Sequence, residues 1–214
     1  MQRSVRSGGI AAHLFACTLL AASSSFAISQ MAAPAKPAAP AEAATKPAVV
    51  HIPPAEDYGR LLGVIEGEFV SAAEAMPEDK FNFAPPAGSG NFHGVRTFGQ
   101  QVKHLAATNN ILAAAALGEE APADAGDEAG PETVRTKAEI LDYLKDSFAH
   151  LGRAVAAIGD ARVPVRPSPI SPLGANSVTR IALITEALVH SFDHYGQMVE
   201  YLRMNGLVPP ASAK

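Results

Sequence analysis

Two histidines four residues apart, His190 and His194, stand in an apolar segment near the carboxyl end of the chain. On an α-helix this spacing is just over one turn, so the two imidazoles project about 40° apart on the same face. Two neutral imidazoles in this arrangement can bind one metal ion from a single rigid element. A third histidine, His104, lies in a similar apolar segment far upstream. The pattern indicates a divalent metal site, and half-buried histidines hydrogen-bonded to carboxylates or to the backbone are the alternative.

The elements that must position these histidines are helical. Apolar residues recur at helical spacing in four stretches, residues 56–75, 92–117, 137–158 and 176–205. Pro77 and Gly118 end the first two stretches, and Thr136-Lys-Ala-Glu139 has the pattern of a capping box before the third. Strand signals are limited to residues 163–165. The fold class is therefore all-α, and a four-helix bundle is its simplest architecture.

The apolar residues of the two histidine-bearing helices predict which faces are buried. On the last helix, the predicted core face contains Ile181, Ile184, Leu188, Phe192, Tyr195, Val199 and Leu202. His190 and His194 lie on the flank of this face, in line with Gln197 and Tyr201. His104 is likewise displaced from the apolar line of its own helix. Histidines on the flanks of two core faces predict a site in a groove between helices.

The amino-terminal residues predict the compartment. Residues 1–27 combine two arginines, an apolar run and a small-residue cleavage site, which is the pattern of a secretory signal peptide. We therefore expect an exported protein, periplasmic or secreted after cleavage. A lipoprotein signal at Cys17 is the weaker alternative, because Phe15 is bulky for such a motif and the apolar stretch before it is short.

Cleavage would leave a linker followed by one domain. Residues 28–54 are rich in Ala, Pro and Lys and offer no apolar face, so we expect a disordered linker. Residues 55–210 have the length of one domain. The only cysteine, Cys17, lies in the predicted signal peptide, so the mature chain would contain neither a disulfide nor a thiolate ligand. Any metal would be held by histidine and carboxylate.

The charge of the chain limits the classes of partner. The formal net charge is −4, and removal of residues 1–27 makes the chain more negative. A mildly acidic chain without a basic cluster is a poor match for nucleic acid. The amino-terminal apolar run is short and interrupted by His13, so we expect no stable membrane span in the mature protein. The expected partner is a small-molecule substrate of unknown identity, and the sequence leaves a homodimer open.

Residues 190–203, with the pattern H-x-x-x-H-Y-G-Q followed by Y-L-R, resemble the closing motif of the DinB/YfiT-like family. Residues 101–104 are similar to the family's histidine position on the second helix. The similarity extends over the whole predicted domain. It implies a four-helix bundle in which a metal is bound by His104, His190 and His194.

Other residues near the three histidines are weaker candidates for the site. His93 opens the same helix as His104 but lies about 16 Å away along its axis, so only one of them can join the pair. The mid-helix His104 is the better candidate. Gln197 and Tyr201 share the face of the histidine pair and are candidates for contacts with a ligand or a bound substrate. The alternative is that Tyr201 packs in the core and Gln197 is solvated.

Three neutral imidazoles leave an open coordination position on a metal, as catalytic centres do. Zn²⁺ suits this ligand set best, and Ni²⁺ is the second candidate. Such a metal would activate a water or a thiol as a nucleophile. The family resemblance implies a thiol-dependent transferase or isomerase, whereas export leaves metal-dependent hydrolysis open. The sequence is also compatible with a periplasmic metal-binding or sensing bundle without turnover, and with a structural bundle without metal.

Overall fold

The computed structural model describes residues 51–120, 122–123, 128–159, 164–165 and 178–213. The predicted signal peptide and almost all of the predicted linker lie outside these residues. The described part contains four long helices, α1 Pro54–Ala75, α2 Phe98–Leu117, α3 Lys137–Ala156 and α4 Arg180–Met204. The shorter elements are the 3-10 turns η1 Glu78–Lys80, η2 Ala87–Ser89 and η3 Pro210–Ser212, and the two-residue strands β1 Pro164–Val165 and β2 Val178–Thr179. The prediction of an all-α chain is confirmed.

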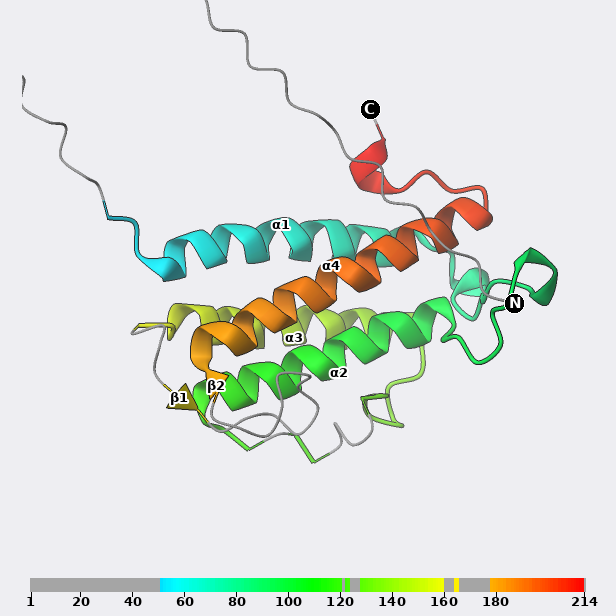
Figure 1. Ribbon diagram of the computed structural model, residues 1–214. Helices are drawn as coiled ribbons and strands as arrows, with labels where there is room; N and C mark the ends of the chain where they lie inside the picture. Colours follow the sequence, from blue (N-terminus) through cyan, green and yellow to red (C-terminus); the bar gives the residue numbers. More distant parts are fainter. Residues whose placement is uncertain (1–50, 121, 124–127, 160–163, 166–177, 214) are drawn as a thin grey trace, which may run out of the picture. The chain divides into compact units, whose positions relative to one another are not determined.

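The four helices form a bundle in which each helix has two main neighbours (Figure 1). α2 packs along α3 and α4, and α1 packs along the same two helices. β1 and β2 pair antiparallel, with Pro164 opposite Thr179, and β2 ends immediately before α4. The line along which α2 packs on α4, called the α2–α4 groove below, therefore brings together residues that are far apart in the sequence. None of the described helices is long and apolar enough to cross a membrane.

A capping box sets the start of α2. The hydroxyl oxygen of Thr97 accepts a hydrogen bond from the Gln100 N–H at 3.3 Å, and Gln100 Oε1 accepts one from the Thr97 N–H at 2.8 Å. These two bonds satisfy backbone donors that a helix start leaves open. The predicted start at residue 92 is therefore wrong, because residues 92–97 are not helical and α2 begins at Phe98.

Threonine caps also set the starts of α3 and α4. Thr136 and Glu139 form the predicted capping box of α3. Thr179 caps α4, and its hydroxyl oxygen accepts a hydrogen bond from the N–H of Ala182 at 3.4 Å. The earlier start near residue 176 that the sequence suggested lies outside the described residues. Local capping thus fixes the position at which each histidine-bearing helix enters the bundle.

The apolar core draws side chains from all four helices, but its face on α4 differs from the predicted one. Phe192, predicted to be in the core, is 40% exposed, whereas His194 is 6% exposed. The face was misassigned because Ser191 and His194 are polar residues on the buried side, where an apolar pattern does not mark them. The buried residues of α4 are Leu183, Ile184, Ala187, Leu188, Ser191, His194, Met198, Tyr201 and Leu202.

Candidate metal centre

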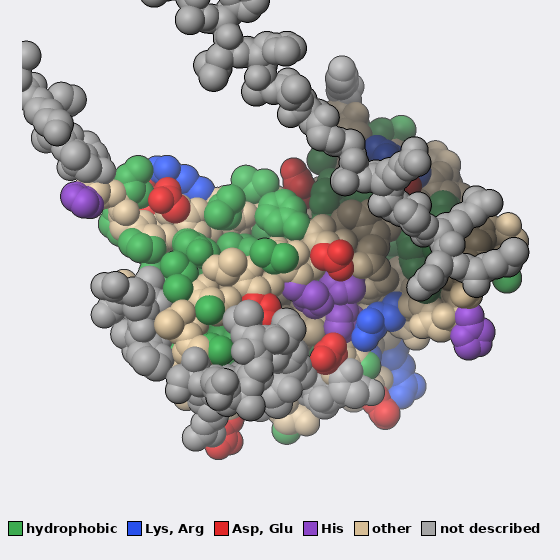
Figure 2. Space-filling view, viewed as in Figure 1, with side chains coloured by type: hydrophobic (Ala, Val, Ile, Leu, Met, Phe, Trp, Pro, Cys, Tyr) green, Lys and Arg blue, Asp and Glu red, His purple; other side chains and the backbone are tan. Residues whose placement is uncertain are grey.

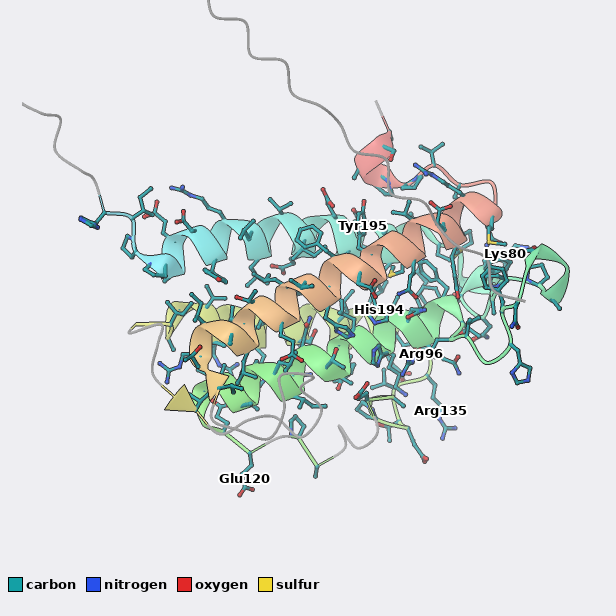
Figure 3. The ribbon with its side chains drawn as sticks, viewed as in Figure 1. Lys80, Arg96, Glu120, Arg135, His194 and Tyr195 are labelled. Carbon is teal, nitrogen blue, oxygen red and sulfur yellow. The ribbon has the colours of Figure 1, made fainter. Side chains whose placement is uncertain are left out.

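Three histidines converge where α2 packs against α4, and Figure 3 shows His194 at this place. His104 lies in the middle of α2, and His190 and His194 lie one turn apart on α4. Each offers one ring nitrogen, and these atoms lie within 4.8 Å of one another. The ring centroids are 5.2, 4.8 and 4.4 Å apart, and the rings meet edge to face. The convergence expected from the sequence is present, and the exposed His93 is not part of it.

Burial favours the neutral form of all three imidazoles. Loss of hydration, assisted by the nearby His104, lowers the pKa of His190 from 6.5 to about 4. The same loss of hydration, assisted by His190, lowers the pKa of His194 to about 3. Burial also lowers the pKa of His104. Near neutral pH the three rings therefore keep a lone pair, which is the form that binds metal ions.

The backbone of Glu128 orients His104. Nδ1 of His104 donates a hydrogen bond to the carbonyl oxygen of Glu128 at 2.9 Å. Because a carbonyl only accepts, the proton resides on Nδ1 and the lone pair on Nε2. Glu128 has a φ of 67°, and it is the non-glycine residue with a positive φ in the described part of the chain. The segment before α3 thus meets the site in an uncommon backbone conformation.

Thr108 orients His190. The Thr108 hydroxyl lies 3.1 and 3.0 Å from the carbonyl oxygens of His104 and Leu105, which engage its single proton. Nδ1 of His190 lies 3.2 Å from the same hydroxyl and can donate to its lone pair. His190 then presents the lone pair of Nε2. Histidines that bind metals commonly have their second nitrogen held in this way.

The facing nitrogens of His190 and His194 fit a shared cation. Their Nε2 atoms lie 2.9 Å apart, a separation at which two lone pairs repel unless a proton or a cation joins them. Nδ1 of His194 is buried and has no hydrogen-bond partner among the described residues. Two nitrogens bound at about 2.0–2.1 Å to one tetrahedral Zn²⁺ would be about 3.3 Å apart. The pair therefore needs only a small adjustment to bind one ion.

The donor set suits a divalent metal that prefers nitrogen. The cluster consists of three imidazoles, ligands that suit Zn²⁺ and Ni²⁺. Two carboxylates lie nearby and favour positive charge at the site. Oε2 of Glu128 is 3.7 Å from Nδ1 of His104, and the charge of Asp193 acts to raise the pKa of His190 against the effect of burial. Three protein ligands leave a position open for water or substrate.

The two other candidate residues have different surroundings. Gln197 lies in the groove, where its Oε1 accepts a hydrogen bond from Gln101 Nε2 and its Nε2 donates one to Asp193, both at 2.9 Å. Tyr201 is buried, and its hydroxyl donates to the carbonyl oxygen of Arg96 at 3.1 Å. Tyr201 therefore links α4 to the start of α2, and Gln197 belongs to a polar contact beside the histidines.

Three contributors to this region were not found from the sequence. Glu128 acts through its carbonyl oxygen, a group that every residue has, so no residue type could have indicated it. Thr108 lies four residues after His104, and this helical spacing could have placed it beside the site. Arg96 precedes the cap of α2, where apolar periodicity gives no information. Their roles depend on tertiary contacts.

Substitution of Thr108 by valine should weaken Zn²⁺ binding about 10- to 100-fold, because it removes the group that holds Nδ1 of His190. Valine has nearly the same shape, so α2 should fold as before. Competition with a chromophoric chelator measures the affinity. Thr185→Val, on α4 and outside the cluster, is the matched control and should bind Zn²⁺ as the wild type does. Equal affinities for the two variants would show that His190 does not depend on Thr108.

Fold and site together define a helical bundle with a candidate three-histidine metal centre in one interhelical groove. Residues 64–198, which include all three histidines, match the DinB superfamily. The chain therefore belongs to the DinB superfamily. A comparison with curated proteins gave no match.

Proposed function

We propose that this DinB-superfamily chain is a metal-dependent enzyme whose ion is held by His104, His190 and His194 and whose substrate is a small molecule. The observation that carries the proposal is the convergence of three imidazole nitrogens within 4.8 Å of one another. The imidazoles are largely buried, and burial keeps them neutral. The hydrogen bonds that Nδ1 of His104 and Nδ1 of His190 donate support metal binding through Nε2 of both residues. Zn²⁺ suits the ligand set best, and Ni²⁺ is the second candidate.

The residues of the groove have separate tasks in this proposal. When bound, the metal would lower the pKa of a coordinated water or thiol and so supply a nucleophile near neutral pH. The three histidines stay neutral and fix the position of the ion. The Gln101–Gln197 pair lines the approach between α2 and α4. Asp193 and Glu128 are the carboxylates near the imidazoles, and they are the candidates to accept a proton from the nucleophile.

Two reaction classes fit this arrangement. Transfer of a thiol to an electrophilic substrate is implied by the family resemblance, and hydrolysis requires only water.

We also propose export, on the basis of residues 1–27, and export favours hydrolysis because cytosolic thiols would be absent. Sequencing of the mature amino terminus tests this point. We expect a new terminus near Ile28, and an intact Met1 on the exported protein would contradict it.

Assays with ester, amide and thiol-plus-electrophile substrates test the proposed enzyme class. The protein loaded with Zn²⁺ or Ni²⁺ should turn over at least one of these classes, and His194→Ala should not. Gln197→Ala should retain the metal but turn over more slowly, because Gln197 lies beside the cluster without belonging to it. A wild-type protein that binds metal and shows no rate above that of His194→Ala would instead be a metal-binding or sensing module without turnover.

A further inference from the structure

Arg96 lies beside the three histidines, at the end of the groove where α2 begins. Figure 3 shows Arg96 next to His194, and Figure 2 shows basic surface directly against the histidine surface. The Arg96 side chain is exposed, and its charge contributes to lowering the pKa of all three imidazoles. A guanidinium thus stands within electrostatic reach of the candidate metal centre.

Four contacts between α2 and α4 follow one another along the groove, from the histidines to Arg96. The first three contacts lie about one helical turn, or about 5 Å, apart along α2, and the last lies just before the start of that helix. In that order they join Thr108 to His190, His104 to His194, Gln101 to Gln197, and the Arg96 carbonyl to Tyr201. The two glutamines therefore occupy the stretch of groove between the metal site and Arg96.

The backbone around Arg96 is held from several sides. Its carbonyl oxygen accepts the hydrogen bond from the Tyr201 hydroxyl at 3.1 Å. The next residue, Thr97, belongs to the capping box of α2. The N–H of Phe98 donates to the carbonyl oxygen of Phe83 at 2.8 Å. The backbone of Arg96 is therefore held in place, while its side chain is exposed to solvent beside the groove.

Within the described part of the chain, the hydrogen bond of Arg96 is made by its backbone carbonyl, and its guanidinium has neither a hydrogen bond nor an ion pair. It differs in this respect from the other arginines of that part. Arg60, Arg153 and Arg203 pair with carboxylates, and Arg135 and Arg180 donate to backbone carbonyls. An unpaired guanidinium offers a planar set of donors that matches the two oxygens of a carboxylate or phosphate.

Gln101 provides a second open group in the same stretch. The residue is 4% exposed. Its Nε2 donates to Gln197, but its Oε1 is buried and has no hydrogen-bond partner among the residues described. A buried amide oxygen without a donor is unfavourable. A ligand N–H or O–H entering the groove would satisfy it.

We propose that Arg96 binds an oxyanionic group, a carboxylate or a phosphate, of the small molecule whose reacting end lies at the three histidines. The inference rests on the proposed function and names its substrate class. Gln101 Oε1 accepts a hydrogen bond from a donor between the two ends of this molecule. The carboxylates of Asp193 and Glu128 lie near the imidazoles, so the anionic end binds on the Arg96 side of the groove.

Binding of small anions to the apo and Zn²⁺-loaded proteins tests this proposal. The probes are succinate and inorganic phosphate, with neutral succinamide as the uncharged comparison, measured by calorimetry at low ionic strength. Arg96→Gln should weaken binding of the preferred anion about tenfold or more and leave succinamide unchanged, because it removes charge-assisted hydrogen bonds. The preferred probe distinguishes a carboxylate ligand from a phosphate ligand. Arg153→Gln, on α3, should bind both anions as the wild type does.

Zn²⁺ affinity, measured separately, distinguishes failure of this inference from failure of the proposed function. Arg96→Gln should bind Zn²⁺ at least as well as the wild type, because it removes a positive charge near the ion. If the wild type binds no metal, the proposed function fails while the apo protein still reports on Arg96. Equal anion affinities for Arg96→Gln and the wild type, in both forms, would overturn the proposal.

Discussion

Replacement of His194 by alanine should raise the dissociation constant for Zn²⁺ by more than 100-fold. Removing a ligand should exceed the 10- to 100-fold effect typical of losing a group that only orients one. His194 is central to the cluster, since its ring centroid lies 4.8 Å from that of His104 and 4.4 Å from that of His190. Competition with a chromophoric chelator, followed by metal analysis of the dialysed protein, gives the measurement.

Two further variants keep this prediction decisive. His194 is buried, so its removal can also affect folding, whereas His190 is half-buried and His190→Ala should lose metal with less effect on the fold. His93→Ala changes an exposed histidine outside the cluster and should bind Zn²⁺ as the wild type does. Folded His190→Ala and His194→Ala proteins with wild-type affinity would exclude a three-histidine site.

The apo protein should lose stability as the pH falls from about 6.5 to about 4. The pKa of His190 is about 4 and that of His194 about 3 in the folded chain, below the ordinary value of 6.5. The unfolded chain therefore binds more protons in this window, and the free energy of unfolding falls as the pH falls. Above about pH 6.5 the contribution of the histidines is fully present. Urea midpoints at about pH 7.5, 6 and 5 measure the effect.

A variant without one of these imidazoles provides the comparison for the pH prediction. His194→Gln keeps a polar side chain but cannot gain the charge, so its urea midpoint should fall less steeply between about pH 6.5 and 5. Ordinary carboxylates titrate mainly below this interval and affect both proteins alike. A wild-type midpoint that stays constant from about pH 7.5 to 5 would show that burial does not hold the imidazoles neutral.

The residues that meet at the site could be named from the sequence because their pattern is local or carries a family motif. The spacing of His190 and His194 defines one helical face by itself. The pairing of these two with His104 required the resemblance to the DinB/YfiT-like motif, because periodicity gives no distance between helices. The homodimer, the exported location and the identity of the metal stay predictions.

The errors have a common physical cause. Apolar periodicity assumes that buried faces are apolar, and on α4 the buried face includes Ser191 and His194 while Phe192 is exposed. The start of α2 was misplaced because the apolar residues before Thr97 lie in a non-helical approach to the cap. The capping box of Thr97 and Gln100 could have been predicted from the sequence, since it has the same pattern as the capping box predicted at Thr136.

The left-handed backbone at Glu128 limits how this sequence can evolve or be engineered. A residue with a Cβ in that conformation costs about 1–2 kcal/mol, and glycine at position 128 would remove this cost against about 0.5–1 kcal/mol from the greater freedom of the unfolded chain. Glycine would also let the segment move away from His104 and would remove the carboxylate beside it. We therefore expect glycine at position 128 to relax the backbone and weaken metal binding together, so that selection for stability and selection for metal affinity favour different residues there.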